Sequence, residues 1–202
     1  MTSVSFTDDI RLDLSRRDFT VNAMAYNERD GLIDFFGGRI DLEAKVIRAV
    51  GDPIKRFTED ALRVLRAVRF AAVLGFTIES ETARALRALA PSLSAVSSER
   101  ILVEWRKLLG GAASYEIISE YRDIVEIIIP TLSGLVMPSR EKYLTLPSDE
   151  RQILLFAKAS GAEGFAAAAK ALKMDNKTRD KGISVLNNLI EISTVDERFL
   201  YR

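Results

Sequence analysis

Residues 57–70, FTEDALRVLRAVRF, decide how the rest of the chain is interpreted. Four charged residues recur at every third position in this stretch, namely Asp60, Arg63, Arg66 and Arg69. Residues three apart are neighbours on a helix surface, and the apolar residues between them follow the spacing of a buried helix face. The pattern therefore predicts one continuous helix with a ridge of one carboxylate followed by three guanidinium groups.

This ridge has the hydrogen-bonding groups needed to distinguish nucleobases. Cytosine and adenine each present a ring-nitrogen acceptor beside an amine donor, whereas guanine and uracil present the reverse pattern. A carboxylate only accepts and a guanidinium only donates, so Asp60 with Arg63 would match cytosine and adenine. Arg66 and Arg69 could hold phosphates. The alternative interpretation is an exposed ion pair between Asp60 and Arg63, with Glu59 assisting, worth less than about 1 kcal/mol.

The composition excludes several kinds of chemistry. The 202 residues contain 29 Lys and Arg against 29 Asp and Glu, so nucleic-acid binding would depend on local clusters. The chain has no cysteine and no histidine, which excludes disulfides, thiolate zinc sites and histidine-based catalysis. No apolar run is long enough for a membrane span and no signal peptide opens the sequence, so we expect a cytoplasmic protein without a membrane partner.

The first 51 residues are predicted to mix helices and strands. A short strand is expected over Val4–Phe6, and Thr7 or Asp8 is expected to cap a helix over residues 9–19. Asp30-Gly31 is typical of the turn between two paired strands, and Val46–Val50 is a further candidate strand. The hairpin strands are expected over residues 22–26 and 32–36.

Arg16, Arg17, Asp18 and Asn22 form a second polar cluster. The two arginines are suited to binding phosphate, and the Asp18 carboxylate could accept a hydrogen bond from a ribose hydroxyl. Asn22 would share a face with Asp18 if the helix continued that far. A basic helix end with a local cap is the alternative interpretation.

Residues 52–202 are predicted to be helical, with one irregular segment. Asp52-Pro53 is typical of a helix start, and Gly75, Pro91, Gly110-Gly111 and Pro130 are expected to end successive helices. Residues 131–147 are expected to be irregular. The predicted helices are 79–89, 97–109, 114–129 with a break near Asp123, 149–159, 161–173 and 176–192.

Four stretches resemble the bacterial class II tRNA nucleotidyltransferase and poly(A) polymerase family, of the CCA-adding type. They are DLSRRDFTVNAMAY (13–26), GLIDFFGGRIDL (31–42), IRAVGDPIKRFTEDALRVLRAVRFAAVLGF (47–76) and, more weakly, SSERILVEWRKLLGG (97–111). The resemblance implies an α+β, predominantly α fold. Residues 1–51 would be an incomplete C-terminal part of a nucleotidyltransferase palm, 52–130 a helical neck with the nucleotide-recognition helix, and 131–202 a helical body and tail.

The resemblance also implies roles for individual residues. Arg17 and Asp18 look like the motif that holds the sugar and phosphates of the incoming nucleotide, with Asn22 supporting them. Asp60 and Arg63 look like the template that recognises cytosine and adenine. Arg66 and Arg69 look like ligands of the triphosphate. The implied partners are ATP, CTP and the 3′ end of tRNA or another RNA.

The sequence departs from the family at the metal site. The family's palm begins with a Gly-Gly loop and an Asp-x-Asp pair that binds two Mg²⁺ ions. This sequence starts after that point, and Asp8, Asp9 and Asp13 lack the spacing to replace the pair on one strand face. We therefore expect a fragment that has no catalytic carboxylates, does not bind Mg²⁺ tightly, is inactive alone and can self-associate through an exposed sheet edge.

Three functions remain open at this point. The chain could be part of a CCA-adding enzyme, part of a poly(A) polymerase or A-adding relative, or a non-catalytic helical protein that binds nucleotides or RNA. The motifs shared by the first two cannot separate them.

Overall fold

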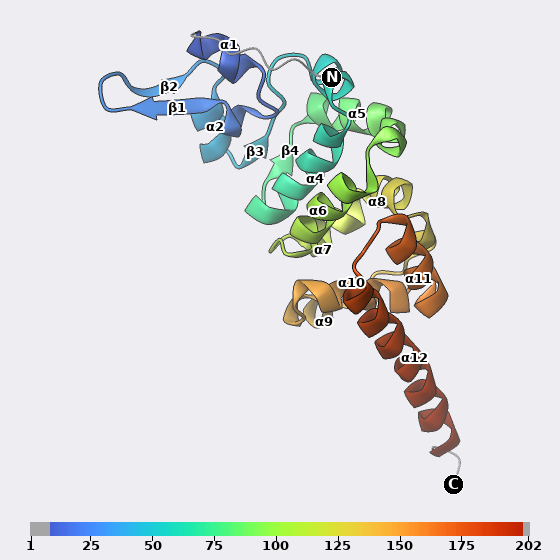
Figure 1. Ribbon diagram of the computed structural model, residues 1–202. Helices are drawn as coiled ribbons and strands as arrows, with labels where there is room; N and C mark the ends of the chain where they lie inside the picture. Colours follow the sequence, from blue (N-terminus) through green and yellow to red (C-terminus); the bar gives the residue numbers. More distant parts are fainter. Residues whose placement is uncertain (1–8, 200–202) are drawn as a thin grey trace.

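A computed structural model describes residues 9–199 and the side chains through residue 189. The chain is mainly helical, with two sheets of two strands each among the described residues, and Figure 1 shows a hairpin at one end and the long helix α12 extending from the other. The predicted α+β, predominantly α fold class is confirmed. None of the described helices combines the length and apolar character needed to cross a membrane.

The N-terminal region begins with a shorter helix than predicted. Helix α1 (Ile10–Ser15) is capped by Asp9, whose side chain accepts hydrogen bonds from two backbone N–H groups. The helix ends at the Arg16 cap, so the prediction of a helix through residue 19 is wrong. The predicted strand over residues 4–6 and the predicted caps Thr7 and Asp8 lie outside the described residues.

The predicted hairpin is confirmed. Strand β1 (Met24–Asn27) pairs antiparallel with β2 (Gly31–Asp34), and Asn27 lies opposite Gly31. Gly31 has a φ of 70°, which glycine adopts without steric cost, so it closes the three-residue connection. The remaining short elements here are η1 (Thr20–Asn22) and α2 (Gly38–Glu43).

The predicted continuous helix over residues 57–70 is wrong at one position. Helix α3 (Pro53–Glu59) and helix α4 (Leu62–Leu74) are separated at Asp60, which has an extended backbone with φ −150° and ψ 105°. The Asp60 carboxylate accepts a hydrogen bond from the Leu62 N–H at 3.1 Å. Aspartate competes in this way with helical hydrogen bonding, so it begins a new helix instead of continuing the old one.

A second small sheet contradicts the prediction that everything after residue 51 is helical. Strand β3 (Val46–Ile47) pairs in parallel with β4 (Thr77–Ile78), which follows the Gly75 cap of α4. The predicted strand over residues 46–50 is therefore shorter than expected, although Ala49 forms an isolated bridge with Phe19. Two residues with no alternating pattern gave no strand signal in the sequence.

The remaining elements are helical, with one correction. Residues 131–147 were predicted to be irregular, but they contain the helix α9 (Arg140–Thr145). The predicted break in the 114–129 helix is confirmed at Tyr121. The other elements are α5 (Ser80–Leu89), η2 (Ala90–Ala95), α6 (Ser98–Leu109), α7 (Ser114–Glu120), α8 (Arg122–Ile128), η3 (Pro130–Leu132), α10 (Ser148–Ala157), α11 (Gly161–Ala171) and α12 (Asn176–Phe199).

One hydrophobic core runs through most of the described chain. It contains Phe19 near one end, Trp105 of α6 at 0% exposure, and Leu186 of α12. Helix α4 packs against α6 within this core (Figure 1). The α4 and α6 side chains that face away from the core are therefore held on a firmly packed helix pair.

Candidate functional site

A cleft of about 580 Å³ lies where the segment after α1, the α3–α4 junction and the start of α6 meet. Five arginines and two aspartates are among its lining residues, so the lining is polar and positively charged overall. The lining residues are Arg16, Arg17, Asp18, Asn22, Asp60, Leu62, Arg63, Arg66, Phe70 and Arg100. Six of the seven predicted nucleotide-binding residues therefore lie together, and Arg69 is the exception.

Asp18 is a buried residue in the wall of this cleft, and its carboxylate accepts four hydrogen bonds. It is 8% exposed, and one carboxylate oxygen accepts hydrogen bonds from the Phe19 N–H at 2.9 Å and the Asn22 amide at 3.0 Å. The other oxygen accepts from Nε and Nη2 of Arg66 at 2.8 and 2.6 Å. A carboxylate offers about four acceptor positions, so this one is fully used. Asp18 and Asn22 thus meet as predicted, although α1 does not continue to them and only Asn22 lies in the short helix η1.

Arg63 is held by both the N-terminal region and α3. Its Nη1 donates to the Arg56 carbonyl at 3.1 Å and to the Glu59 carboxylate at 2.9 Å. Its Nη2 donates to the Arg16 carbonyl at 2.9 Å. A guanidinium has five N–H donors, so these contacts with described residues leave two donors for a ligand in the cleft.

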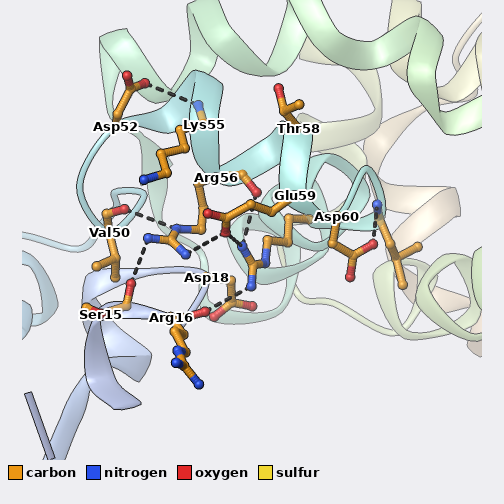
Figure 2. A network of polar contacts seen from close by, with 12 residues as sticks. Ser15, Arg16, Asp18, Val50, Asp52, Lys55, Arg56, Thr58, Glu59 and Asp60 are labelled. Carbon is orange, nitrogen blue, oxygen red and sulfur yellow. Dashed lines mark hydrogen bonds and ion pairs between the residues drawn. The ribbon is translucent and has the colours of Figure 1, made fainter. Parts of the chain in front are cut away.

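Arg56 of α3 also links the N-terminal region to α3. Its guanidinium donates to the Ser15 carbonyl at 2.7 Å, to the Val50 carbonyl at 3.2 Å and to Glu59 at 2.7 Å. Figure 2 shows these side chains converging between α1 and α3. The end of α1 is therefore fixed against the helix that leads to Asp60.

Asp60 does not pair with Arg63, contrary to the ion pair that the sequence allowed. Its second carboxylate oxygen accepts from Nη2 of Arg100 at 2.8 Å, across the cleft on α6. Arg100 was not among the predicted nucleotide-binding residues, because forty residues separate it from Asp60 and no local spacing links them. The Asp60 carboxylate keeps about two acceptor positions beyond its bonds to Leu62 and Arg100.

Arg66 and Arg69 have different surroundings. The Arg66 side chain is 33% exposed and lines the cleft, with its guanidinium bound to Asp18. Arg69 is 9% exposed and donates from Nε to the Glu104 carboxylate at 2.9 Å. Its guanidinium carbon lies 3.4 Å from the centre of the Phe70 ring. The predicted ridge therefore splits, with Arg66 facing the cleft and Arg69 behind it.

Arg17 lies at the rim, where its guanidinium pairs with Asp13 at 3.0 Å. Both side chains are about half exposed, so this is a surface ion pair of small energy, under about 1 kcal/mol. The Arg17 guanidinium can exchange this partner for a ligand anion at little cost.

The described residues do not fit a magnesium site. They contain no group of three or more carboxylates that could hold a metal ion. Asp9 caps α1, Asp13 pairs with Arg17, and the carboxylates of Asp18 and Asp60 are held by arginines. Cationic partners of this kind oppose metal coordination by the carboxylates of Asp13, Asp18 and Asp60.

Comparison with known proteins identifies the class. The family model "Poly A polymerase head domain" matches residues 1–48, and "Probable RNA and SrmB-binding site of polymerase A" matches residues 75–133. The chain belongs to the tRNA nucleotidyltransferase and poly(A) polymerase family, as the sequence resemblance suggested.

Within that family, similar curated proteins include CCA-adding enzymes. The one from Geobacillus stearothermophilus is 37% identical over 197 residues, which are 94% of this chain and 48% of that protein. The one from Bacillus subtilis is 50% identical over 113 residues, covering 56% of this chain and 28% of that protein. The chain thus spans about half the length, or less, of these relatives.

Solved structures show the same relationship. The Bacillus stearothermophilus CCA-adding enzyme in complex with CTP has a TM-score of 0.73 and 34% identity, covering 93% of this chain and 49% of that one. The Thermotoga maritima CCA-adding enzyme complexed with tRNA has a TM-score of 0.70 and 25% identity, covering 95% and 53%.

Proposed function

We propose that the cleft binds CTP and ATP, and that the chain supplies this nucleotide site to an enzyme that adds CMP and AMP to the 3′ end of tRNA without a nucleic-acid template. The family membership supports this reaction class, and the relatives named for complexes with CTP and with tRNA support the substrates. The chain spans about half the length of those relatives, so it would supply this site as one part of the complete enzyme.

Asp60 and Arg63 would read the base edge. The Asp60 carboxylate keeps acceptor positions for an exocyclic amine, and Arg63 keeps donors for a ring nitrogen or carbonyl oxygen. Cytosine and adenine satisfy this pair, whereas uracil places a carbonyl against the carboxylate. A polar group left unpaired in this way costs about 1–3 kcal/mol.

Arg17 and Arg66 would hold the phosphates. Both line the cleft, and a guanidinium can donate two parallel hydrogen bonds to a phosphate group. Asp18 and Asn22 would act by holding Arg66 in place, since the Asp18 oxygens are already fully used. A direct bond from a ribose hydroxyl to Asp18 would have to displace one of these donors.

The observation that carries the proposal is the meeting of Asp60, Arg63, Arg17 and Arg66 around one cleft. Isothermal titration of the chain with CTP, ATP, UTP and GTP tests it. We expect CTP and ATP to bind at least about tenfold more tightly than UTP and GTP, a factor that corresponds to about 1.4 kcal/mol. Equal affinity for all four nucleotides would contradict the proposed base reading.

A poly(A) polymerase is the second candidate, and the match to the poly(A) polymerase head domain favours it. Both enzymes require ATP, so the discriminating ligand is CTP. Tight CTP binding supports CCA addition, whereas binding of ATP alone supports the second candidate. A non-catalytic protein that binds nucleotides or RNA is the third, and it predicts that Asp60→Ala leaves tRNA ends in cells unchanged.

Two further expectations belong to the proposal. Mg²⁺ would act in the complete enzyme through carboxylates that the described residues do not provide. Self-association through a sheet edge stays a prediction. Each strand of the two described sheets has only one strand partner, so its other edge is not paired with a described strand. A single monomeric species in light scattering at high protein concentration would contradict it.

A further inference from the structure

A buried pair of charged side chains lies directly behind the cleft. Glu104 of α6 is 4% exposed and Arg69 of α4 is 9% exposed. Charged residues are almost never buried this far unless they are paired, because removing a charge from water is costly. The two side chains therefore depend on each other, since Arg69 Nε donates to Glu104 Oε2 at 2.9 Å.

The buried pair continues into the cleft wall. The other Glu104 oxygen lies 3.8 Å from Nη1 of Arg66, and the opposite edge of the Arg66 guanidinium is bound by Asp18. Four groups of alternating charge, Asp18, Arg66, Glu104 and Arg69, thus run from the N-terminal segment through α4 to α6. Arg66 is the member that faces the cleft.

Arg69 is not placed to reach a ligand in the cleft. Its guanidinium lies against the Phe70 ring at 3.4 Å, and it is Phe70 that contributes to the lining. Its charge therefore acts on Glu104 and on the aromatic ring. Both the spacing of Arg66 and Arg69 and the family resemblance predicted one role for the two residues, and neither distinguishes a side chain at the cleft from one behind it.

We propose that Glu104 is a positioning residue for Arg66, and that Arg69 acts through Glu104 and not by contact with the nucleotide. This inference rests on the proposed function, in which Arg66 holds the triphosphate. Carboxylates on two sides fix the plane of the Arg66 guanidinium, while three of its five donors remain free of hydrogen bonds to described residues. A side chain ordered before binding loses less entropy when the ligand arrives.

The test compares CTP with cytidine, which has the same base and no phosphate. Affinities of the chain for both are measured by NMR titration for the wild type and for Glu104→Gln. We expect Glu104→Gln to bind CTP about three- to tenfold more weakly, from the entropy of one freed side chain, while cytidine affinity changes less than about twofold. Glu99→Gln is the matched control on the same helix, because Glu99 pairs with Lys173 and does not line the cleft. It should change neither affinity.

Glu104→Gln leaves the buried Arg69 charge beside a neutral side chain, and this could prevent folding. A second variant tests the proposal in that case. Arg69→Met with Glu104→Gln removes both charges, and replacement of a buried pair is often tolerated where removal of one partner is not. We expect the double variant to bind CTP about three- to tenfold more weakly than the wild type, the loss predicted for Glu104→Gln, and no more weakly than that. An additional loss of about tenfold would place Arg69 on the phosphates and overturn its proposed role.

The remaining outcomes distinguish the positioning role of Glu104 from the proposed nucleotide binding. Unchanged CTP affinity in a folded Glu104 variant, or an equal loss of affinity for CTP and cytidine, would overturn the positioning role while leaving the proposed function in place. A wild-type chain that binds CTP no more tightly than cytidine would remove the proposed phosphate site, and this inference with it.

Discussion

Arg63 is held in place by other residues of the chain and, in the proposed function, also contacts the base. Three of its donors hold the Arg16 carbonyl, the Arg56 carbonyl and Glu59, so its position is set by the N-terminal segment and α3 together. A side chain fixed in this way can discriminate bases because its remaining donors do not rearrange to suit the wrong one. Base selectivity should therefore depend on residues that never touch the base.

Asp60 carries the other half of the base recognition, so its removal should abolish selectivity. We expect Asp60→Ala to reduce the preference for CTP over UTP by about tenfold or more, since the amine of cytosine loses its acceptor. Nucleotide titration of the purified chain measures this effect.

The matched control for this variant is Asp52→Ala, which removes a carboxylate that caps α3 and does not line the cleft. Loss of the cap should lower stability by about 1 kcal/mol and leave the preference for CTP intact. Selectivity that survives in Asp60→Ala would contradict the assigned role of Asp60.

At the scale of elements, caps and turn residues made most of the helices predictable. Gly75 and Ser97 mark helix ends as expected, and Gly31 closes the hairpin. The break at Asp60 was missed because the apolar pattern continues across it, while one side-chain hydrogen bond to Leu62 decides the backbone. Contacts between distant segments, such as Arg100 with Asp60, leave no local pattern and could not be predicted.

The start of α12 provides a prediction for pH. Hydrogen bonds from the backbone N–H and the hydroxyl of Thr178, with Arg106 assisting, lower the pKa of Asp175 to about 2. A carboxylate with a lowered pKa stabilises the fold above its ordinary pKa, near 3.8, and this contribution is lost as pH falls toward 2. We expect the melting temperature of the wild type to exceed that of Asp175→Asn at pH 5.

This difference in melting temperature should disappear as the pH approaches 2. Thermal unfolding followed by circular dichroism from pH 5 to pH 2 measures it. A difference that stays constant over this range would show that the charge of Asp175 does not contribute to stability.

Arg151 ties α6, α9 and α10 together. Its guanidinium donates to backbone carbonyls of Leu109, Gly111, Leu144 and Leu146. We expect Arg151→Met to lower the free energy of unfolding by about 3 kcal/mol, because these carbonyls lose a charged donor. Urea denaturation measures the loss, and Arg122→Met, which breaks a pair between neighbouring turns of α8 with Glu126, should cost less than about 1 kcal/mol.

At the scale of the whole molecule, one core connects the cleft to the C-terminal helices. Trp105 is fully buried in it and donates from its indole nitrogen to Gln152 at 3.0 Å. The division into residues 1–51, 52–130 and 131–202 stays a prediction. Since the core crosses the boundary at 130, we expect Trp105 fluorescence and circular dichroism to report one coincident unfolding transition in urea. Two separated transitions would favour independent units.

The structure of the chain bound to CTP tests the central claim most directly. Crystals grown with CTP should show the cytosine edge against Asp60 and Arg63, and the triphosphate against Arg17 and Arg66, with Arg69 still paired to Glu104. CTP bound elsewhere on the chain, or seated in the cleft with its base away from Asp60, would contradict the proposed nucleotide site.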